Sequence, residues 1–274
     1  MKSPSITRLS EVDSTNRYAL DRIATLDDGQ VIVADRQTAG RGRLRRTWSS
    51  AEGNLAASIV LKPREVRHVP NLTQYMALTV CETVEGYGAE ACLKWPNDVQ
   101  SAGRKLAGIL SEAVFTGARF DGIVVGVGVN LNMDPAQLER IDQPAISLNL
   151  LVGTRVDRDS FLEALLARFF QGYPRFLEEG FPGIRGRYLE RFPWIGREIV
   201  VSAGETRITG KVAGLTEEGA LVLEDPGGKR RVVTVGDVVA RTAPWREVPA
   251  CMPSGRGCLR LPDPPPGRDS PLPD

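Results

Sequence analysis

Four arginines and two glycines lie in a nine-residue stretch that ends in a tryptophan, GRGRLRRTW (residues 40–48). Glycine lets backbone N–H groups approach an anion closely, and arginine offers a permanent charge with a planar fork of donors for carboxylate or phosphate. Trp48 adds a flat face on which a nucleobase can stack. The stretch is therefore a candidate anion site, and without its ligand the like charges should repel one another and leave the loop mobile.

Three further segments place polar side chains at turns or in strands. DSTN (residues 13–16) precedes a helical pattern, and its ordinary interpretation is a helix N-cap. KWPND (residues 94–98) and RKLAGIL (residues 104–110) flank a turn, and their ordinary interpretation is a β-hairpin with charged residues at its ends. GVGVNLN (residues 126–132) is a strand pattern whose glycines indicate close approach of a ligand or another backbone. It lacks the GxxG and helix of a dinucleotide site.

The overall charge argues against an extended nucleic-acid surface. The 274 residues carry a formal net charge of only +1, whereas nucleic-acid-binding domains are usually broadly basic. The arginine cluster therefore predicts a local site for small anions. As the RNA-binding alternative, the loop would be an RGG-like element with an affinity that falls steeply with salt.

Several protein classes are disfavoured by composition. No apolar run approaches the roughly 18 residues that span a bilayer, and the N-terminus has no hydrophobic signal core. The single histidine, His68, makes a polyhistidine metal centre or Ser-His-Asp chemistry improbable, and we expect it in a surface loop. No pair of cysteines forms a CxxC motif, so we expect neither a zinc site nor a disulfide framework, and a reducing cytoplasm fits best. The cysteines are Cys81, Cys92, Cys251 and Cys258.

The elements that must position these residues follow from hydrophobic periodicity. Strand patterns cover residues 31–34, 55–61, 106–114 and 123–129, and helical patterns cover residues 72–85 and 159–178. Asp157 or Asp159 is expected to cap the second helix, and Gly180 to end it. Closely spaced short strands from about residue 195 predict a small β-barrel, and the Pro- and Gly-rich end predicts disorder. We therefore divide the chain into residues 1–194, 195–246 and 247–274.

Taken together and in order, the motifs resemble those of biotin protein ligases (biotin–[acetyl-CoA-carboxylase] ligases). The series is STN, QxxGRGRxxRxW, Asn54-Leu55, KWPNDV, KLAGIL and GVGVNLN, and the resemblance runs from about residue 12 to 241. It implies an α+β catalytic domain with a mixed sheet, similar to class II aminoacyl-tRNA synthetases, followed by an SH3-like β-barrel. Lipoate ligases share the fold but lack this set of motifs.

The resemblance implies a two-step reaction with biotin and ATP as substrates and with Mg²⁺ carried by the nucleotide. The biotin carboxylate attacks the α-phosphate and forms biotinyl-5′-AMP, and a lysine of a carrier domain then displaces AMP. The implied partner is the biotin carboxyl carrier domain of acetyl-CoA carboxylase or a related carboxylase. The implied enzyme acts without a membrane or nucleic acid, as a monomer or homodimer.

The resemblance also implies roles for individual residues. The implied biotin-binding residues are Ser14, Thr15, Asn16, Gln37, Gly40, Arg41, Arg43, Lys105 and Gly108. The implied adenylate-binding residues are Arg43, Trp48, Asn97, Lys105, Gly126 and Asn130. Arg43 and Lys105 would carry the working charges of catalysis, and Asp98 would orient the incoming amine. Arg45 stands where the family commonly has a third glycine, so loop mobility and retention of the intermediate are expected to differ.

Two alternatives share the motifs or the fold. A lipoate or octanoate ligase or transferase of similar fold would use the same cleft. A biotin-dependent DNA-binding regulator would need an N-terminal winged helix-turn-helix, and the STN motif begins too near the start at Ser14 for one. We therefore expect no direct operator binding. Comparing biotin with lipoate in ATP–pyrophosphate exchange separates the first alternative from the main hypothesis.

Overall fold

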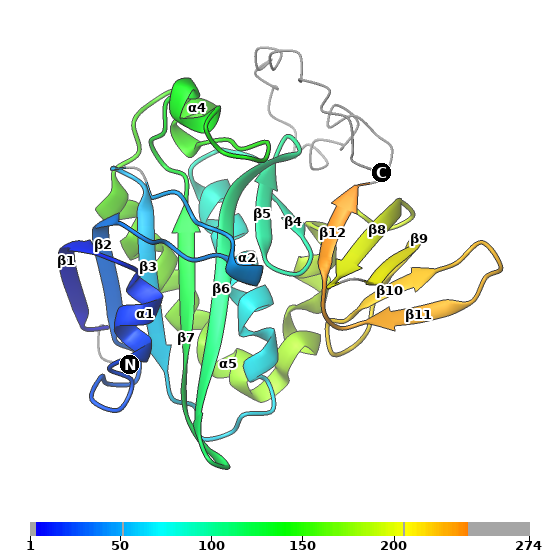
Figure 1. Ribbon diagram of the computed structural model, residues 1–274, viewed down its shortest axis with the longest axis horizontal. Coiled ribbons are helices and arrows are strands. Elements are labelled where there is room, and N and C mark those ends of the chain that lie inside the picture. The colour runs from blue at the N-terminus through cyan, green and yellow to red at the C-terminus, as the bar shows by residue number, and fades with distance from the viewer. Residues whose placement is uncertain (1–3, 51, 205, 241–274) are drawn as a thin grey trace.

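The computed structural model describes residues 4–50, 52–204 and 206–240, so the predicted disordered tail (residues 247–274) lies outside the described residues. Two β-sheets organise the chain, and the smaller one packs beside strands β4 and β5 at one end of the larger one (Figure 1). The helices lie against the larger sheet.

The larger sheet has seven strands in the order β1-β2-β3-β7-β6-β5-β4. The β1–β2 pair is parallel, and every other pair in this sheet is antiparallel. The sheet is therefore mixed, as predicted. Its strands are β1 (Ile6–Val12), β2 (Val31–Gln37), β3 (Leu55–Leu61), β4 (Cys92–Lys94), β5 (Asp98–Ser101), β6 (Arg104–Thr116) and β7 (Arg119–Val129).

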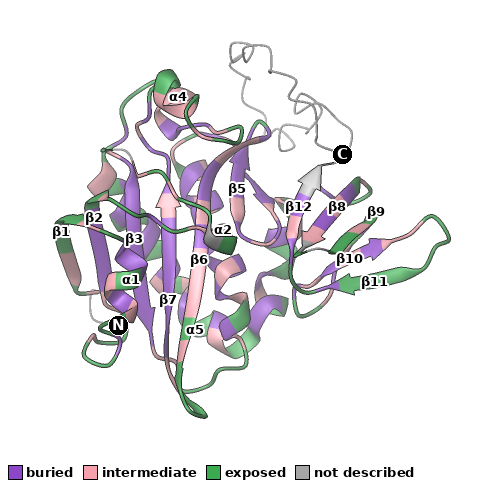
Figure 2. Ribbon diagram, in the orientation of Figure 1, coloured by how far each residue is buried: buried purple, intermediate pink, exposed green. Residues whose placement is uncertain are grey.

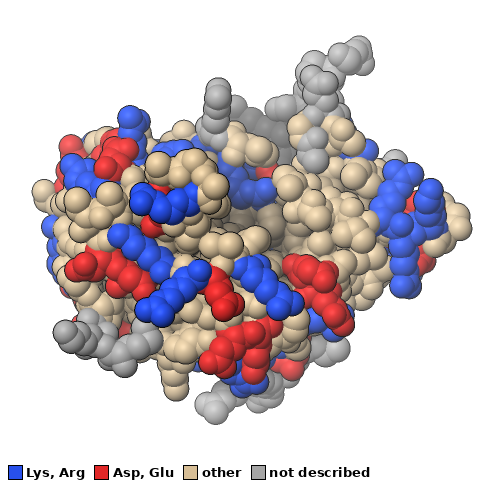
Figure 3. All heavy atoms as spheres, turned by 90° about the horizontal axis from the view of Figure 1, so that it is seen from below, with Lys and Arg blue, Asp and Glu red and all other residues tan. Residues whose placement is uncertain are grey.

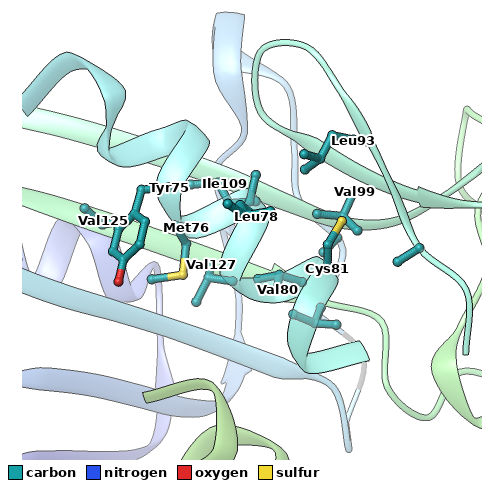
Figure 4. Close-up of a cluster of buried hydrophobic side chains, with 14 of the residues drawn as sticks. Tyr75, Met76, Leu78, Val80, Cys81, Leu93, Val99, Ile109, Val125 and Val127 are labelled. Atoms are coloured by element: carbon teal, nitrogen blue, oxygen red, sulfur yellow. The ribbon is translucent and has the colours of Figure 1, made fainter. Parts of the chain in front are cut away.

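Alternation along the central strands gives the sheet two different faces. On β7 (Arg119–Val129), Val125 and Val127 point to one face, where α2 (Leu72–Gly86) and α5 (Arg158–Glu190) cover a large apolar core. Figure 4 shows the part of this core between α2 and the strands, and Figure 2 shows that β3 and most of β7 are buried, whereas much of β6 is only partly buried. The opposite face carries the short helix α1 (Thr15–Leu20) over a smaller apolar cluster. The helix predicted at residues 72–85 is confirmed.

The long helix α5 departs from the prediction at its C-terminal end. Of the two predicted caps, Asp157 is the N-cap of α5, and its side chain accepts a hydrogen bond from the amide of Ser160. Gly180 adopts φ 64° and ψ −147°, which kinks the helix, but helical structure resumes and continues to Glu190. A β-carbon at Gly180 would collide with the ring of His68, which also packs edge-on against Phe176. His68 therefore lies in a turn, as expected, with a half-buried side chain that packs against α5.

The smaller sheet is antiparallel, with the order β11-β10-β9-β8-β12. Its apolar side chains belong to the same hydrophobic cluster as the larger sheet, so the two units share a continuous core. The Trp95 indole N–H and the Gln74 amide also donate to the Gly219 carbonyl, at 3.1 and 2.9 Å. These contacts fix the smaller sheet beside the KWPND turn. Its strands are β8 (Glu198–Ala203), β9 (Thr206–Leu215), β10 (Leu221–Glu224), β11 (Arg230–Val233) and β12 (Asp237–Ala240).

Three further short helices or turns lie outside the arginine loop. They are α3 (Pro135–Leu138), α4 (Leu148–Val152) and the 3₁₀ turn η2 (Val69–Asn71) that leads into α2.

Candidate active site

Small residues form the floor of a cleft on the α1 face of the sheet. Gly126 pairs with Ser58 of β3, and Gly128 pairs with Gly108 of β6, so their α-carbons lie side by side across three strands. A β-carbon at Gly126 would collide with the Asn16 side chain, and one at Gly128 would overlap the indole ring of Trp48. The two strand glycines therefore make room for side chains from α1 and from the arginine loop, rather than for another backbone.

The DSTN segment is both a helix cap and a wall of this cleft. Ser14 is the N-cap of α1 and its hydroxyl accepts from the Arg17 amide, as the ordinary interpretation predicted. Gln37, at the end of β2, accepts from the amide and the hydroxyl of Thr15 at 2.8 and 3.1 Å. The Gln37 amide nitrogen donates to Ser50. The polar wall is thus held in place by local hydrogen bonds.

A polar network continues from this wall to the arginine loop. The Ser58 hydroxyl lies 2.6 Å from Asn16 Oδ1, and the Asn16 amide donates to Glu112 at 2.9 Å. The other carboxylate oxygen of Glu112 binds the Arg41 guanidinium at 2.8 Å. This chain of contacts, buried at Ser58 and Asn16 and exposed at Arg41, ties the start of the loop to β6.

The arginine loop is anchored by carboxylates at several points. Arg43 donates to Asn97 Oδ1 and to Asp237 Oδ1, both at 3.0 Å, and Arg46 lies 2.7 Å from the other oxygen of Asp237. Arg41 is held by Glu112. Two carboxylates remote in sequence thus pair with three of the four loop arginines, so the repulsion expected within the loop is partly balanced by the protein itself.

The loop turns at Leu44 rather than at Arg45. Arg43–Arg45 form a short 3₁₀ turn, η1, and Leu44 adopts the left-handed conformation at φ 53° with its side chain exposed. A left-handed backbone is costly for a leucine. Arg45, which occupies the position of the usual family glycine, follows directly. The left-handed residue of the loop is therefore Leu44, the neighbour of Arg45.

The KWPND turn brings two side chains of opposite charge into the cleft. Lys105 Nζ lies 2.8 Å from Asp98 Oδ1, and both side chains are mostly buried. Asn97 donates to the Ile109 carbonyl at 2.9 Å, and this bond orients its oxygen toward Arg43. Lys94 pairs with Asp98 across β4 and β5. Burial lowers the pKa of the Lys94 amine, and the Asp98 carboxylate acts in the opposite direction.

A second hollow opens beside the cleft, between Trp48 and the strand end at Asn130. Lys105 Nζ lies 5.6 Å from the centre of the Trp48 ring, so the same lysine borders both spaces. Asn130 donates to the Ile146 carbonyl at 3.1 Å. Its Oδ1 and the Trp48 Nε1 are buried without a hydrogen-bond partner in the described part of the chain. Unpaired buried polar atoms of this kind fit a ligand that carries its own donors and acceptors.

Most of the residues singled out from the sequence come together in one cleft of about 870 Å³ of atom-free space, part of it open to solvent. The cleft residues are Ser14, Thr15, Asn16, Gln37, Arg41, Arg43, Trp48, Asn97, Asp98, Lys105, Gly108 and Gly126. Gly40 lies instead on a neighbouring groove across the arginine loop, and Asn130 lines the second hollow.

Sequence reasoning missed three polar residues of this site. Ser58 had a signal, because it is the one polar residue in the apolar strand LAASIVL (residues 55–61). Glu112 and Asp237 had none, since an acidic residue in a strand or at a turn is usually a solvated surface group. Only the fold brings them to the loop.

Charge on the surface is mixed in sign. Acidic and basic side chains alternate across most of the face seen in Figure 3. Within residues 4–240, apart from the two undescribed positions, no helix is long and apolar enough to cross a membrane. The same residues contain no group of three histidine, cysteine or acidic side chains placed to hold a metal ion.

Comparison with known proteins agrees with this architecture. The model of the biotin/lipoate A/B protein ligase family matches residues 9–130, and that of the biotin protein ligase C terminal domain matches residues 194–241. The fold and cleft thus define a ligase-type catalytic domain followed by this C-terminal domain, and the predicted fold class is confirmed.

Individual relatives narrow the class. The biotin–[acetyl-CoA-carboxylase] ligase of Paracoccus denitrificans is 34% identical over 239 residues, which cover 84% of this chain and 98% of that protein. The solved biotin protein ligase from Aquifex aeolicus in complex with biotin and ATP is 32% identical with a TM-score of 0.76, covering 87% of this chain and 99% of that one. The bifunctional ligase/repressor BirA of Bacillus subtilis is 32% identical, and the match covers 75% of this chain but only 64% of that protein. This chain belongs to the biotin protein ligase family.

Proposed function

We propose that this protein activates biotin with ATP to form biotinyl-5′-AMP and transfers the biotinyl group to a lysine of a carrier domain. The observation that carries the proposal is the meeting of three chemistries around Lys105. A polar pocket lies on one side of Lys105. On the other side lie Trp48 and Asn130, each with a buried polar atom that has no hydrogen-bond partner among the described residues, and the cations Arg43 and Lys105 lie between the two spaces. Relatives at 34% and 32% identity are named as biotin ligases, which favours biotin over lipoate.

The polar pocket is the proposed biotin site. A ureido ring offers two N–H donors and one carbonyl acceptor, and Ser14, Thr15 and Gln37 present matching groups. The small residues Ala56 and Gly108 leave space for the ring and its apolar chain beside the strands. Backbone groups near Gly40 and Arg41 are proposed to assist, and Asn16 supports this wall through Ser58.

The cations are proposed to enable the first step. A biotin carboxylate and a triphosphate repel each other, so fixed positive charge at the point of attack lowers the barrier. Arg43 and Lys105 are proposed to bind the carboxylate and the α-phosphate, with Asn97 orienting Arg43. Mg²⁺ bound to ATP would supply further charge neutralisation when present. The described residues offer it no dedicated cage.

The second step needs an amine held beside the activated carbonyl. Asp98 is proposed to orient the carrier lysine, because its carboxylate already binds one ammonium group, that of Lys105, at 2.8 Å. The biotinyl-AMP bond hydrolyses readily, so water must be kept out until the acceptor arrives. The arginine loop is the proposed cover.

The nucleotide base is assigned to the second hollow. Trp48 is proposed to stack on adenine, and the unpaired Asn130 Oδ1 to accept from its amino group. Gly126 is proposed to take part in adenylate binding from the floor of the main cleft, where it leaves room for Asn16.

The setting of the reaction completes the proposal. The acceptor is proposed to be the biotin carboxyl carrier domain of acetyl-CoA carboxylase or a related carboxylase, met in the cytoplasm by a monomer or homodimer. Residues 1–194 are the proposed catalytic unit and residues 195–246 the proposed C-terminal domain.

One assay tests the proposal. Pyrophosphate exchange into ATP is measured with biotin, lipoate or octanoate as the only carboxylate, followed by transfer to a purified carrier domain. We expect exchange with biotin and modification of one lysine. Exchange that is faster with lipoate or octanoate, or that needs no carboxylate, would refute the proposed substrate.

A further inference from the structure

The C-terminal sheet reaches into the cleft through one carboxylate. Asp237, the first residue of β12, places Oδ1 3.0 Å from Arg43 Nη1 and Oδ2 2.7 Å from Arg46 Nη2. The carbonyl of the preceding residue, Gly236, accepts from the same Arg43 nitrogen at 3.3 Å. The Asp237 side chain is only 14% exposed and lines the cleft itself. Two loop arginines therefore share one interdomain carboxylate inside the proposed nucleotide site.

This contact is one of two anchors of the arginine loop, and the two differ in location. Arg41 is held by Glu112 within the catalytic sheet, on the side of the polar wall. Arg43 and Arg46 are held by Asp237 from the other unit, and both line the cleft. Arg41 lines the cleft as well, but its partner Glu112 does not, so Asp237 is the anchoring carboxylate that a ligand in the cleft would meet.

A carboxylate that binds two guanidinium groups through separate oxygens imitates a phosphate. Arginine recognises both anions through the same fork of donors, and a polyphosphate carries more charge than a carboxylate. Lys94 and Lys105 line the same cleft, so the bound polyphosphate would meet further cations there. Asp237 and the phosphates of a nucleotide must therefore compete for Arg43 and Arg46.

We propose that Asp237 is a positioning residue of the nucleotide site, which holds the loop arginines until polyphosphate displaces it and recovers them when pyrophosphate leaves. The proposal rests on the proposed function of the cleft. Competition makes Asp237 unfavourable for pyrophosphate binding. Recovery of the arginines makes it favourable for retention of biotinyl-AMP, because the loop is again fixed over the intermediate. The two effects have opposite signs.

Removing the Asp237 charge should therefore change pyrophosphate binding and biotinyl-AMP retention in opposite directions, which can be tested. Asp237→Asn keeps the shape and the backbone pairing with Ser202 but removes the charge. We expect pyrophosphate to bind about fivefold more tightly and biotinyl-AMP to dissociate about fivefold faster, the effect of one partly exposed ion pair in each case. The affinity for biotin alone should stay unchanged. Pyrophosphate binding is measured by calorimetry and adenylate release by a chase of the purified enzyme–adenylate complex.

Glu224→Gln is the matched control. Glu224 lies in the same sheet, and its one ion pair within the described part of the chain is with Arg230 on the neighbouring strand, at 3.2 Å, so removing its charge should leave both measurements at the wild-type values. Should Asp237→Asn not fold, Asp237→Ser removes the same charge with a smaller side chain and carries the same expectations.

Two results would overturn the inference. If pyrophosphate binding weakens together with adenylate retention, Asp237 merely supports the fold of the site. If neither quantity differs from that of Glu224→Gln, the carboxylate does not compete with phosphate. Failure of the proposed function is recognised separately, because wild-type protein would then show no biotin-dependent exchange, whereas the calorimetric arm needs no biotin.

Discussion

The substitution Gly128→Ala tests the floor of the cleft with a single methyl group. A β-carbon built at Gly128 would lie 2.5 Å from Trp48 Nε1 and 2.6 Å from Trp48 Cζ2, where ordinary contacts begin at 3.4 Å. The indole must therefore withdraw from the strand by about 1 Å to reach ordinary contact distance. Trp48 is half-exposed, so the ring can move without unpacking the core.

The size of the effect follows from the proposed role of Trp48. Stacking of a base on an aromatic side chain contributes about 1–3 kcal/mol, which corresponds to about fivefold to a hundredfold in affinity. A displaced ring should lose much of that stacking. We therefore expect the KM for ATP to rise by about tenfold or more, with biotin affinity little changed because the polar wall lies on the other side of Lys105.

The KM for ATP is measured by biotin-dependent pyrophosphate exchange, and biotin affinity by calorimetry without nucleotide. Gly86→Ala is the control, since a β-carbon there meets nothing within 4 Å. Thermal unfolding of both variants identifies any general loss of stability. An unchanged KM for ATP in a folded Gly128→Ala protein would show that Trp48 does not support the nucleotide from this position.

Three other substitutions test other parts of the site and fold. Arg43→Gly should stay folded but release biotinyl-AMP about tenfold to a hundredfold faster, because hydrogen bonds from a charged group are lost, and ultrafiltration of the free adenylate measures this. Tight retention would contradict the role of Arg43. Lys105→Ala should slow single-turnover adenylate formation by about a hundredfold to a thousandfold, and a loss below about tenfold would make Lys105 peripheral. Gly186→Ala, at an exposed and uncrowded position of α5, should raise the free energy of unfolding by about 0.5–1 kcal/mol in denaturant titration.

Local patterns predicted most elements because their causes are local. The strand patterns at residues 55–61 and 123–129 and the helix at residues 72–85 follow from side-chain periodicity, and all three occur. Gly180 shows the limit of this reasoning. Its positive φ was expected to end a helix, yet the chain resumes helical structure because the following residues, Phe181 and Ile184, pack into the same core.

Sequence alone determined the elements, the motif order and therefore the family resemblance, because each depends on residue types at short spacing. It also identified the arginine loop as an anion site. It could not show how the loop is balanced, since Glu112 and Asp237 lie 71 and 194 residues from the arginines they bind. Those contacts exist only because β6 crosses the cleft and the C-terminal sheet docks beside the KWPND turn. Long-range pairing of charges leaves no local pattern, so the tertiary structure alone decided which carboxylates hold the loop.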